Sequence, residues 1–296
     1  MNNLLVICGP TATGKSALAI NLAKQFNGEV ISADSRQVYR GLDIGTAKVT
    51  HDEMQGVPHH MIDIANPMDY FSVVDFQNQA QQIIADIHAR GKLPIVCGGT
   101  GMYIDAVVYG TKFPEVPANH QLRAELEKLS AADLYEKLQE LDPERAMEID
   151  EHNPVRLIRA IEIATVLGSV PKIEIRQPQY TSYFVGLELP KEILRERIEQ
   201  RIKDRIPALF DEIKKLLDQG ISPERLHSFG LEYRYGSEYV EGKLTESEFI
   251  EILTNKTWQF AKRQMLWFQK NKTIHWFDPI NEQQKILESV QNFLSY

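Results

Sequence analysis

The first part of the chain alternates short apolar runs with amphipathic helical segments. Buried strands are predicted over Leu4–Cys8, Glu29–Ser35 and Leu93–Cys97, where apolar residues follow one another without helical periodicity. Helices are predicted over Ala17–Ala23 and Ser72–Arg90; the second begins at a serine N-cap and stops before a glycine. This alternation is typical of an α/β fold, in which a parallel sheet is flanked by helices.

The later part of the chain first changes character and then returns to the same alternation. From about Phe113, two prolines open a helix-rich stretch that runs to about Gly168 without strand signals. Further strands are predicted over Met61–Ile64, Tyr183–Leu189 and Thr273–Phe277, and further helices over Lys191–Gly220, over Thr245–Lys270 and in the last segment to Tyr296. We therefore expect a core domain over 1–112 and 180–296, with a helical insertion subdomain over 113–179.

A glycine-rich turn joins the first predicted strand to the first helix. It has the P-loop spacing G-x-x-x-x-G-K-S and consists of Gly9, Pro10, Thr11, Ala12, Thr13, Gly14, Lys15 and Ser16. In such a turn, backbone N–H groups and the helix N-terminus face phosphate oxygens. Lys15 adds a full charge, and the Ser16 hydroxyl is placed to hold a phosphate-bound Mg²⁺. The turn predicts a di- or triphosphate site within a P-loop NTPase-like sheet, and the same turn occurs in ATP-binding proteins.

Composition narrows the class of protein. The chain has 296 residues, 43% hydrophobic and 25% charged, and no apolar run approaches the length of a membrane span. We also find no targeting segment, and the two cysteines, Cys8 and Cys97, fit buried positions in a reducing cytoplasm. The net charge of −8 argues against nucleic acid as a partner, but 252–277 lacks acidic residues and interleaves Lys and Arg with aromatics. That segment is a candidate RNA-binding surface.

Asp34 is the carboxylate that the pattern brings closest to the phosphates. NTP hydrolases usually carry an Asp after a second buried strand to help hold Mg²⁺, but Leu93–Cys97 is followed by Gly98 and Gly99. The strand over Glu29–Ser35 instead contains Asp34 at its carboxyl end, where ligands of α/β sheets bind. From the residues alone, Asp34 is either a metal-site residue or a base.

Several segments along the chain form a consistent series. The longest, Ile-Ser-Ala-Asp-Ser-Arg-Gln-Val-Tyr-Arg-Gly-Leu-Asp-Ile-Gly-Thr-Ala-Lys over 31–48, follows the P-loop. The others, in order, are Pro58–Ile64, Gly98–Tyr103, Arg156–Glu162 and Ala261–Phe268. Together they resemble the tRNA dimethylallyltransferase (tRNA isopentenyltransferase) family over nearly the whole chain.

The resemblance implies a prenyl transfer. A dimethylallyl group would move from dimethylallyl diphosphate to N6 of adenosine 37, beside the anticodon of a tRNA. The catalytic residues implied are Asp34, Thr100 and Arg201. An exocyclic aromatic amine is a weak nucleophile, so Asp34 would accept its proton, while Arg201, Lys15, the loop amides and Mg²⁺ would stabilise the departing diphosphate.

The resemblance also implies a set of tRNA contacts. Bases that are modified or read in RNA loops are unstacked and then held by polar, aromatic and arginine side chains. The candidates are Asp34, Ser35, Arg36, Gln37, Thr100, Arg123, Val155, Arg156, Leu157, Ile158, Arg159, Lys262, Arg263 and Gln264. We expect the insertion subdomain to contact tRNA, and the protein to act as a monomer in the cytoplasm.

Plainer interpretations remain open at this point. Asp34 fits a loop cap, Arg201 fits a solvated basic helix face with Arg197 and Arg205, and His59-His60 fits structural histidines better than a metal site. Two other functions also fit the residues: a P-loop kinase of small molecules or nucleotides, and a catalytically weak RNA-binding paralogue.

Two segments depart from the family pattern. The stretch Gly230–Tyr235 replaces a glycine-tyrosine-basic-polar motif, and Arg205–Phe210 lacks a usual Met and Gly and contains Pro207. Pro207 is expected to end or kink its helix just after Arg201. These departures leave the diphosphate site intact and bear on the RNA side.

Overall fold

The computed structural model describes residues 2–172 and 178–295 and divides into two compact units. Unit 1 comprises Met1–Gly110 and Gln177–Tyr296, and unit 2 comprises Thr111–Arg176. The sequence placed these limits at 112 and 180, a few residues away. Each unit is described by itself below.

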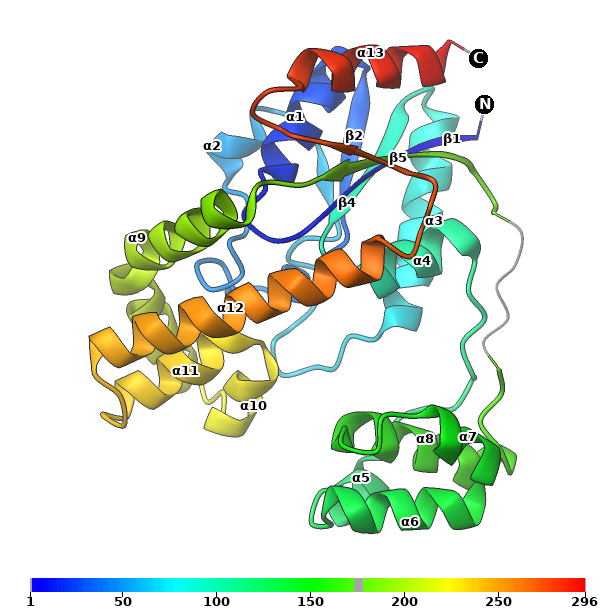
Figure 1. The fold of residues 1–296 in the computed structure, drawn as a ribbon, viewed down its shortest axis with the longest axis vertical. Helices are drawn as coiled ribbons and strands as arrows, with labels where there is room; N and C mark the ends of the chain where they lie inside the picture. Colours follow the sequence, from blue (N-terminus) through cyan, green and yellow to red (C-terminus); the bar gives the residue numbers. More distant parts are fainter. Residues whose placement is uncertain (1, 173–177, 296) are drawn as a thin grey trace. The chain divides into compact units, whose positions relative to one another are not determined.

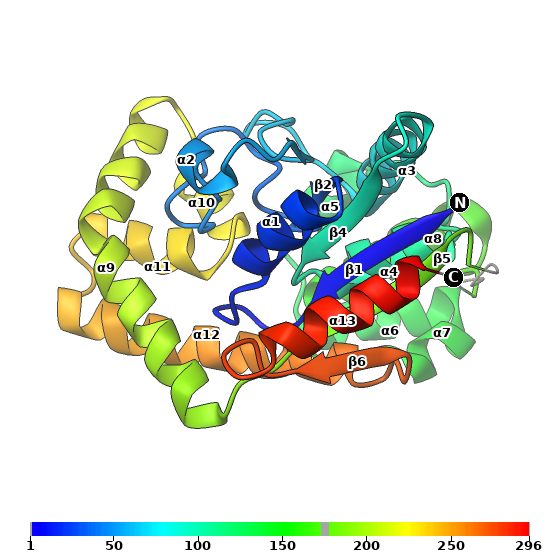
Figure 2. The ribbon, with the colours of Figure 1, turned by 90° about the horizontal axis from the view of Figure 1, so that it is seen from above.

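Unit 1 is built on a parallel sheet (Figures 1 and 2). Within the described residues the sheet has six strands in the order β3-β2-β4-β1-β5-β6, and all neighbours are parallel. The strands are β1 (Asn3–Cys8), β2 (Gly28–Ser32), β3 (His59–His60), β4 (Leu93–Gly98), β5 (Thr181–Leu187) and β6 (Ile274–Phe277). The α/β fold predicted from the sequence is confirmed, and the carboxyl ends of β1, β2 and β4 share one edge.

Helices cover both faces of the sheet (Figure 2). On one face lie α1 (Lys15–Gln25) and α13 (Gln283–Leu294). The other face is covered by α3 (Val73–Ala89), α4 (Gly101–Tyr109) and the end of α12 (Glu246–Phe268). The short α2 (His51–Met54) lies between β2 and β3 in the chain.

The pleat of β1 explains why both faces are apolar. Leu5 and Ile7 point to one face, where they pack with Ile286 of α13, while Leu4 and Val6 point to the other, where they pack with Phe76 of α3. All four β1 residues are fully buried. A central parallel strand covered on both faces is expected to be apolar throughout, and this is the run seen in the sequence.

A helical layer beyond the sheet forms a core of its own. It contains α9 (Lys191–Asp218), α10 (Pro223–Ser228), α11 (Leu231–Val240) and most of α12, which lie together in Figure 1. Along α9, apolar residues recur at helical spacing and pack against Tyr233 and Phe249. This packing places the apolar face of α9 in the core.

Of the two effects expected at Pro207, an end or a kink of the helix, the structure excludes the first, because α9 continues through Pro207. It spans 28 residues with Pro207 inside. Proline removes one backbone N–H donor, but Ile206, Leu209 and Phe210 around it are buried, and their packing compensates for that loss.

Across 2–172 and 178–295, no helix has both the length and the apolar character needed to span a membrane.

The short third strand is also displaced from its predicted position. It lies at His59–His60, and not over Met61–Ile64. Met61 and Asp63 have φ angles of 63° and 56°, which no β-strand accommodates. Met61 is buried, but Ile62 and Ile64 are only partly buried and Asp63 is exposed, and the apolar pattern could not reveal the left-handed turns.

Unit 2 is all helical in its described residues. It contains α5 (His120–Leu126), α6 (Ala131–Leu141), α7 (Pro143–Glu148) and α8 (Pro154–Leu167). Asparagine, serine or aspartate side chains cap the N-terminus of each helix. The core of the unit is made of leucine, isoleucine and alanine side chains, mainly from α6 and α8.

Candidate active site

A cavity of about 670 Å³ opens at the carboxyl edge of the sheet in unit 1. Its wall is formed by the P-loop, the residues after β2, and the helices α9 and α12. The predicted site residues that line it are Thr11, Ala12, Gly14, Lys15, Ser16, Asp34, Gln37, Arg201 and Gln264. The structure therefore brings the predicted phosphate site, the predicted base and the predicted arginine into one cavity.

The P-loop owes its shape to two glycines and one buried threonine. Gly9 has a φ of 136°, and a side chain at this position would collide with the backbone of Leu187 in β5. Gly14 has a φ of 91° just before α1. The hydroxyl of Thr13, fully buried, donates to the carbonyl of Pro10 at 2.9 Å. The shape of the loop therefore depends on the left-handed glycines, on the bond within the loop and on the close approach of β5.

Lys15 and Ser16 begin helix α1 at the cavity wall. The Lys15 ammonium donates to the carbonyl of Pro10 at 2.6 Å, and burial lowers its pKa to about 8. Ser16 is exposed and lines the cavity. A hydroxyl on a helix N-terminus beside a phosphate site suits Mg²⁺, which is usually held by one or two protein ligands and by substrate phosphates. The residues present therefore fit Mg²⁺ bound together with a diphosphate.

Asp34 acts as a turn cap and also faces the cavity. Its Oδ1 accepts hydrogen bonds from the backbone N–H of Arg36 at 2.8 Å and of Gln37 at 3.3 Å. Among the described residues, its Oδ2 has no hydrogen-bond partner. One oxygen therefore caps the turn, and the assignment of Asp34 as a base stays a prediction.

Arginines of α9 supply positive charge to the opposite wall. Arg201 donates to the hydroxyl of Thr11 at 2.8 Å, and burial lowers the pKa of its guanidinium. Arg197 and Arg205 line the same cavity. Their i±4 spacing was visible in the sequence but fitted a solvated face equally well; the packing of α9 over the P-loop turns the arginines inward.

Gln264 has a different place from the one expected for an RNA contact. Its side chain accepts from the N–H of Thr11 and donates to the carbonyl of Gly99, both at 2.9 Å. Only 8% of it is exposed. Gln264 thus ties the P-loop to the turn after β4 at the cavity wall, and its assignment as an RNA contact stays a prediction. Lys262 and Arg263 beside it are exposed.

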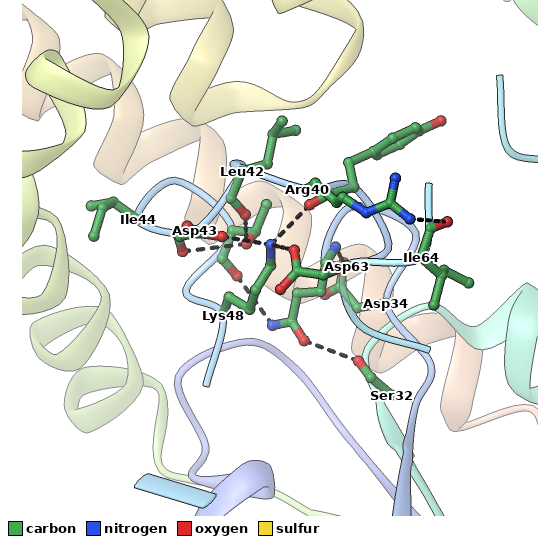
Figure 3. Close-up of polar contacts among 12 residues, drawn as sticks. Ser32, Asp34, Arg40, Leu42, Asp43, Ile44, Lys48, Asp63 and Ile64 are labelled. Atoms are coloured by element: carbon green, nitrogen blue, oxygen red, sulfur yellow. Dashed lines mark hydrogen bonds and ion pairs between the residues drawn. The ribbon is translucent and has the colours of Figure 1, made fainter. Parts of the chain in front are cut away.

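Gln37 and Thr100 also make internal bonds. The Gln37 amide accepts from Ser32 at 2.9 Å and donates to the carbonyls of Thr46 and Ala47, both at 3.3 Å, in the network of Figure 3. Thr100 precedes α4 and accepts from the N–H of Ser35 at 3.3 Å. Thr100 does not belong to the cavity wall formed by the described residues.

The remaining residues of the Asp34 turn are Ser35 and Arg36. Both are partly buried and follow directly after the candidate base. Their position beside Asp34 would let them contact a nucleobase that enters there.

Two predicted RNA contacts in unit 2 form an internal ion cluster. Arg123 binds the fully buried carboxylate of Glu162 with contacts of 3.0 and 2.8 Å, and Arg159 binds the same carboxylate and the carbonyl of Val116. Burial opposes ionisation of Glu162, but its hydrogen bonds, first from Arg123 and then from the backbone and Arg159, lower the pKa to about 2. Arg123 and Arg159 thus stabilise unit 2.

The first turns of α8 divide into buried and exposed positions. Leu157 is fully buried and Ile158 is 8% exposed, so their side chains belong to the core of unit 2. This corrects the expectation that they contact tRNA directly. Val155 is 77% exposed, and Arg156 is exposed beside it. These two side chains are the part of the predicted α8 contact set that is presented outward to a partner.

The adjacent histidines each make one internal hydrogen bond through a ring nitrogen. His59 Nδ1 bonds the carbonyl of Val57 and His60 Nε2 bonds Glu29, both at 2.8 Å. In the part of the chain that is described, no group of three His, Cys, Asp or Glu side chains could hold a metal. His59 lines the cavity, and its buried Nε2 has no partner among the described residues. Sequence reasoning did not place it there.

Comparison with known proteins places this site in a family. Residues 37–271 match the model of the family described as IPP transferase. A tRNA dimethylallyltransferase of Anoxybacillus flavithermus is 43% identical, covering 93% of this chain and 90% of the relative, and one of Halalkalibacterium halodurans is 40% identical, covering 99% and 96%.

Solved structures agree with these relatives. A tRNA isopentenylpyrophosphate transferase from Bacillus halodurans superposes with a TM-score of 0.75 at 38% identity, covering 100% of this chain and 97% of that one. A eukaryotic dimethylallyltransferase acting on tRNA superposes with a TM-score of 0.85 at 28% identity, covering 100% and 80%. The chain belongs to the IPP transferase family.

Proposed function

We propose that this protein transfers a dimethylallyl group from dimethylallyl diphosphate to N6 of adenosine 37 of tRNA. One observation carries the proposal: the P-loop, Arg201 and the free oxygen of Asp34 face a single cavity. Cations for a leaving diphosphate and an acceptor for a proton are the two requirements of this reaction. The relatives named tRNA dimethylallyltransferase support the same assignment.

The diphosphate would be held between the P-loop and α9. Backbone N–H groups of the loop, the Lys15 ammonium and the Arg201 guanidinium all lie along this part of the wall. Ser16 would hold a Mg²⁺ ion bound to the same diphosphate, and that ion would neutralise charge on the leaving group. The Thr11 hydroxyl fixes the Arg201 guanidinium, so this charge is in place before the donor arrives.

The amine would be activated on the Asp34 side of the cavity. Adenine N6 forms a bond to the allylic carbon while the bond from that carbon to the diphosphate oxygen breaks. The electron pair of the broken bond leaves with the diphosphate, and the N6 proton passes to Asp34 Oδ2. Because Oδ1 is already bonded to two backbone N–H groups, the carboxylate is held with its second oxygen free.

Exposed side chains of each unit would contact the tRNA. Val155 and Arg156 of unit 2 and Lys262 and Arg263 of α12 are exposed, and Arg263 lies beside the ring of Phe260, which lines the cavity. Basic side chains next to aromatic rings suit an RNA loop with unstacked bases. Since every reacting group comes from one chain, a monomer suffices, and the expected location is the cytoplasm, where tRNA is modified.

A direct transfer assay tests the proposal. Pure protein, Mg²⁺ and dimethylallyl diphosphate are incubated with an anticodon stem-loop that carries adenosine at position 37. The mass of the RNA is then measured by mass spectrometry. We expect a gain of one dimethylallyl group, and no gain on a control stem-loop with guanosine at position 37. An unchanged RNA mass would overturn the proposal, and ATP consumption in a parallel reaction would indicate a kinase.

A further inference from the structure

A carboxylate outside the cavity holds the loop that carries part of the cavity wall. Glu212 of α9 accepts hydrogen bonds from three successive backbone N–H groups: Asp43 and Ile44 at 2.8 Å and Gly45 at 3.1 Å. It also accepts from the Tyr233 hydroxyl at 2.6 Å. Each carboxylate oxygen therefore accepts two hydrogen bonds, which is the full capacity of an ionised carboxylate.

The loop needs this partner because its own backbone leaves these donors unused. Residues 43–48 form a tight turn in which Ala47 N–H donates to the carbonyl of Ile44 and Lys48 N–H to that of Asp43, the pair of bonds of a Schellman motif, with Ala47 in the left-handed region. The N–H groups at the start of such a turn have no partner within it. Glu212 satisfies them from another element, in the way that a capping side chain does within one helix.

The hydrogen bonds by which Glu212 holds the loop, called the clamp below, depend on the side-chain sizes at Gly45 and Tyr233. A Cβ atom at Gly45 would lie 2.6 Å from Tyr233 Cζ, so only glycine lets the ring reach Glu212. Tyr233 is 1% exposed, and its burial, together with the nearby Glu212, raises its pKa well above the ordinary value. The phenol therefore remains a proton donor to the carboxylate at physiological pH.

Lys48 holds the same loop through a second set of hydrogen bonds and ion pairs. The Lys48 ammonium donates to the carbonyl of Tyr39 at 2.8 Å and to the carboxylates of Asp43 at 2.6 Å and Asp63 at 2.5 Å, as Figure 3 shows. The carbonyls of Thr46 and Ala47 accept hydrogen bonds from the Gln37 side-chain amide. The loop is thereby linked to the turn whose first residue is Asp34, since Gln37 N–H bonds Asp34 Oδ1.

Glu212 and Arg201 lie on one continuous helix. They are eleven residues apart on α9, which corresponds to about 16 Å along the axis. The same helix therefore binds the P-loop through Arg201 and the Asp34–Lys48 segment through Glu212. A displacement of about 1 Å between reacting groups can cost 100-fold in rate, so such a connection has a direct effect on catalysis.

We infer that Glu212, assisted by Tyr233, is a positioning residue that sets the distance between the Asp34 base and the Arg201 site. This inference rests on the proposed prenyl transfer. Glu212 itself touches neither substrate nor cavity; it acts through the backbone of the loop. Loss of the clamp should therefore slow the chemical step while leaving the P-loop able to bind the donor.

The test compares Glu212→Gln with Tyr233→Phe and with the control Glu199→Gln. Glu199 lies on the same helix, its side chain is 43% exposed, and its carboxylate pairs with Lys203. In Glu212→Gln we expect kcat to fall about 100-fold and the KM for dimethylallyl diphosphate to stay within about twofold. Tyr233→Phe removes one of the four hydrogen bonds and should lower kcat by only about fivefold.

Hydrogen exchange provides the readout that does not depend on activity. The amides of Asp43, Ile44 and Gly45 should exchange about tenfold faster in Glu212→Gln, with amides of β1 and β4 unchanged. Faster exchange with unaltered kcat would overturn the positioning role, and unaltered exchange would overturn the clamp. A lower fraction of folded protein with normal kcat per folded molecule would show a purely structural role. If wild-type protein transfers no prenyl group, the proposed function fails, while the exchange result still stands.

Discussion

Arg201 on α9 donates a hydrogen bond to the hydroxyl of Thr11 in the P-loop, across 190 residues of sequence and a distance of 2.8 Å. This bond brings a guanidinium from the second half of the chain to the P-loop in the first half, where we propose that a diphosphate binds. A P-loop alone binds phosphate; with Arg201 beside it, the site can also stabilise the charge that develops on a departing diphosphate.

The first prediction concerns Arg201. Arg201→Ala should lower kcat for prenyl transfer by about 100- to 1,000-fold, because one preformed donor to the leaving group is removed. The affinity for tRNA, measured by filter binding, should change less than about threefold. Arg195→Ala is the matched control, since Arg195 is an exposed residue of the same helix bonded to Asn255. A loss of tRNA affinity with normal kcat would make Arg201 a docking residue.

The second prediction concerns the base. Asp34→Asn keeps an acceptor for the backbone bonds at Oδ1 but removes the proton acceptor, so kcat should fall by about 100- to 10,000-fold. Diphosphate and tRNA should still bind, as calorimetry would show. The exposed Asp52→Asn serves as control. Near wild-type single-turnover rates in Asp34→Asn would remove Asp34 from the mechanism.

The third prediction follows from the lowered pKa of Lys15. A lysine with a pKa of about 8 is charged below that pH and neutral above it, so the free protein should bind diphosphate more weakly as pH rises through about 8. Calorimetric titration between pH 6.5 and 9.5 measures this. In Lys15→Arg the side chain stays charged, and the decline should be absent apart from the ionisation of the ligand itself. Identical pH profiles for the two proteins would contradict the assignment.

The fourth prediction concerns the stability of unit 2. Glu162 has a pKa of about 2 in the folded state, below that of an unfolded glutamate near 4.5, so its contribution is present above about pH 4.5 and is lost as pH falls towards 2. Glu162→Gln should lower the free energy of unfolding by about 3 kcal/mol at pH 7, since it leaves Arg123 and Arg159 without their buried partner. Urea unfolding monitored by circular dichroism tests this.

The control for that prediction is Glu140→Gln, an exposed position of α6. It should unfold like the wild type at every pH. A Glu162→Gln protein that keeps full stability at pH 7 would show that the ion cluster contributes nothing net.

The fifth prediction separates RNA binding from chemistry. Arg156→Ala and the pair Lys262→Ala with Arg263→Ala should weaken tRNA binding by about 3- to 30-fold. The salt dependence of binding should also fall, by about one released ion for each phosphate that the variant no longer neutralises. Diphosphate binding should be unaffected. Lys285→Ala on α13 is the control, because Lys285 is exposed and pairs with Glu282. Unchanged affinity in all variants would exclude these surfaces.

The sequence alone predicts those elements whose structure depends on residues close together in the chain. The P-loop, the serine N-cap of α3 with Asp75 and the apolar central strands could all be predicted, because each depends on residues a few positions apart. The roles of Gln264 and Gln37 could not, since their partners lie in other segments or in backbone carbonyls that the sequence does not reveal. The same holds for His59, whose free nitrogen becomes part of the cavity only through the turns around it.

The P-loop strand β1 pairs with β4 on one side and with β5 on the other, and unit 2 lies between these two neighbours in the chain. A ribosome therefore finishes unit 2 before the second neighbour of β1 exists. Until Leu187 has been synthesised, one edge of β1 has no partner, and Arg201 and Gln264 emerge later still. The P-loop therefore acquires its hydrogen bonds to Arg201 and Gln264 only after unit 2 and β5 have been made.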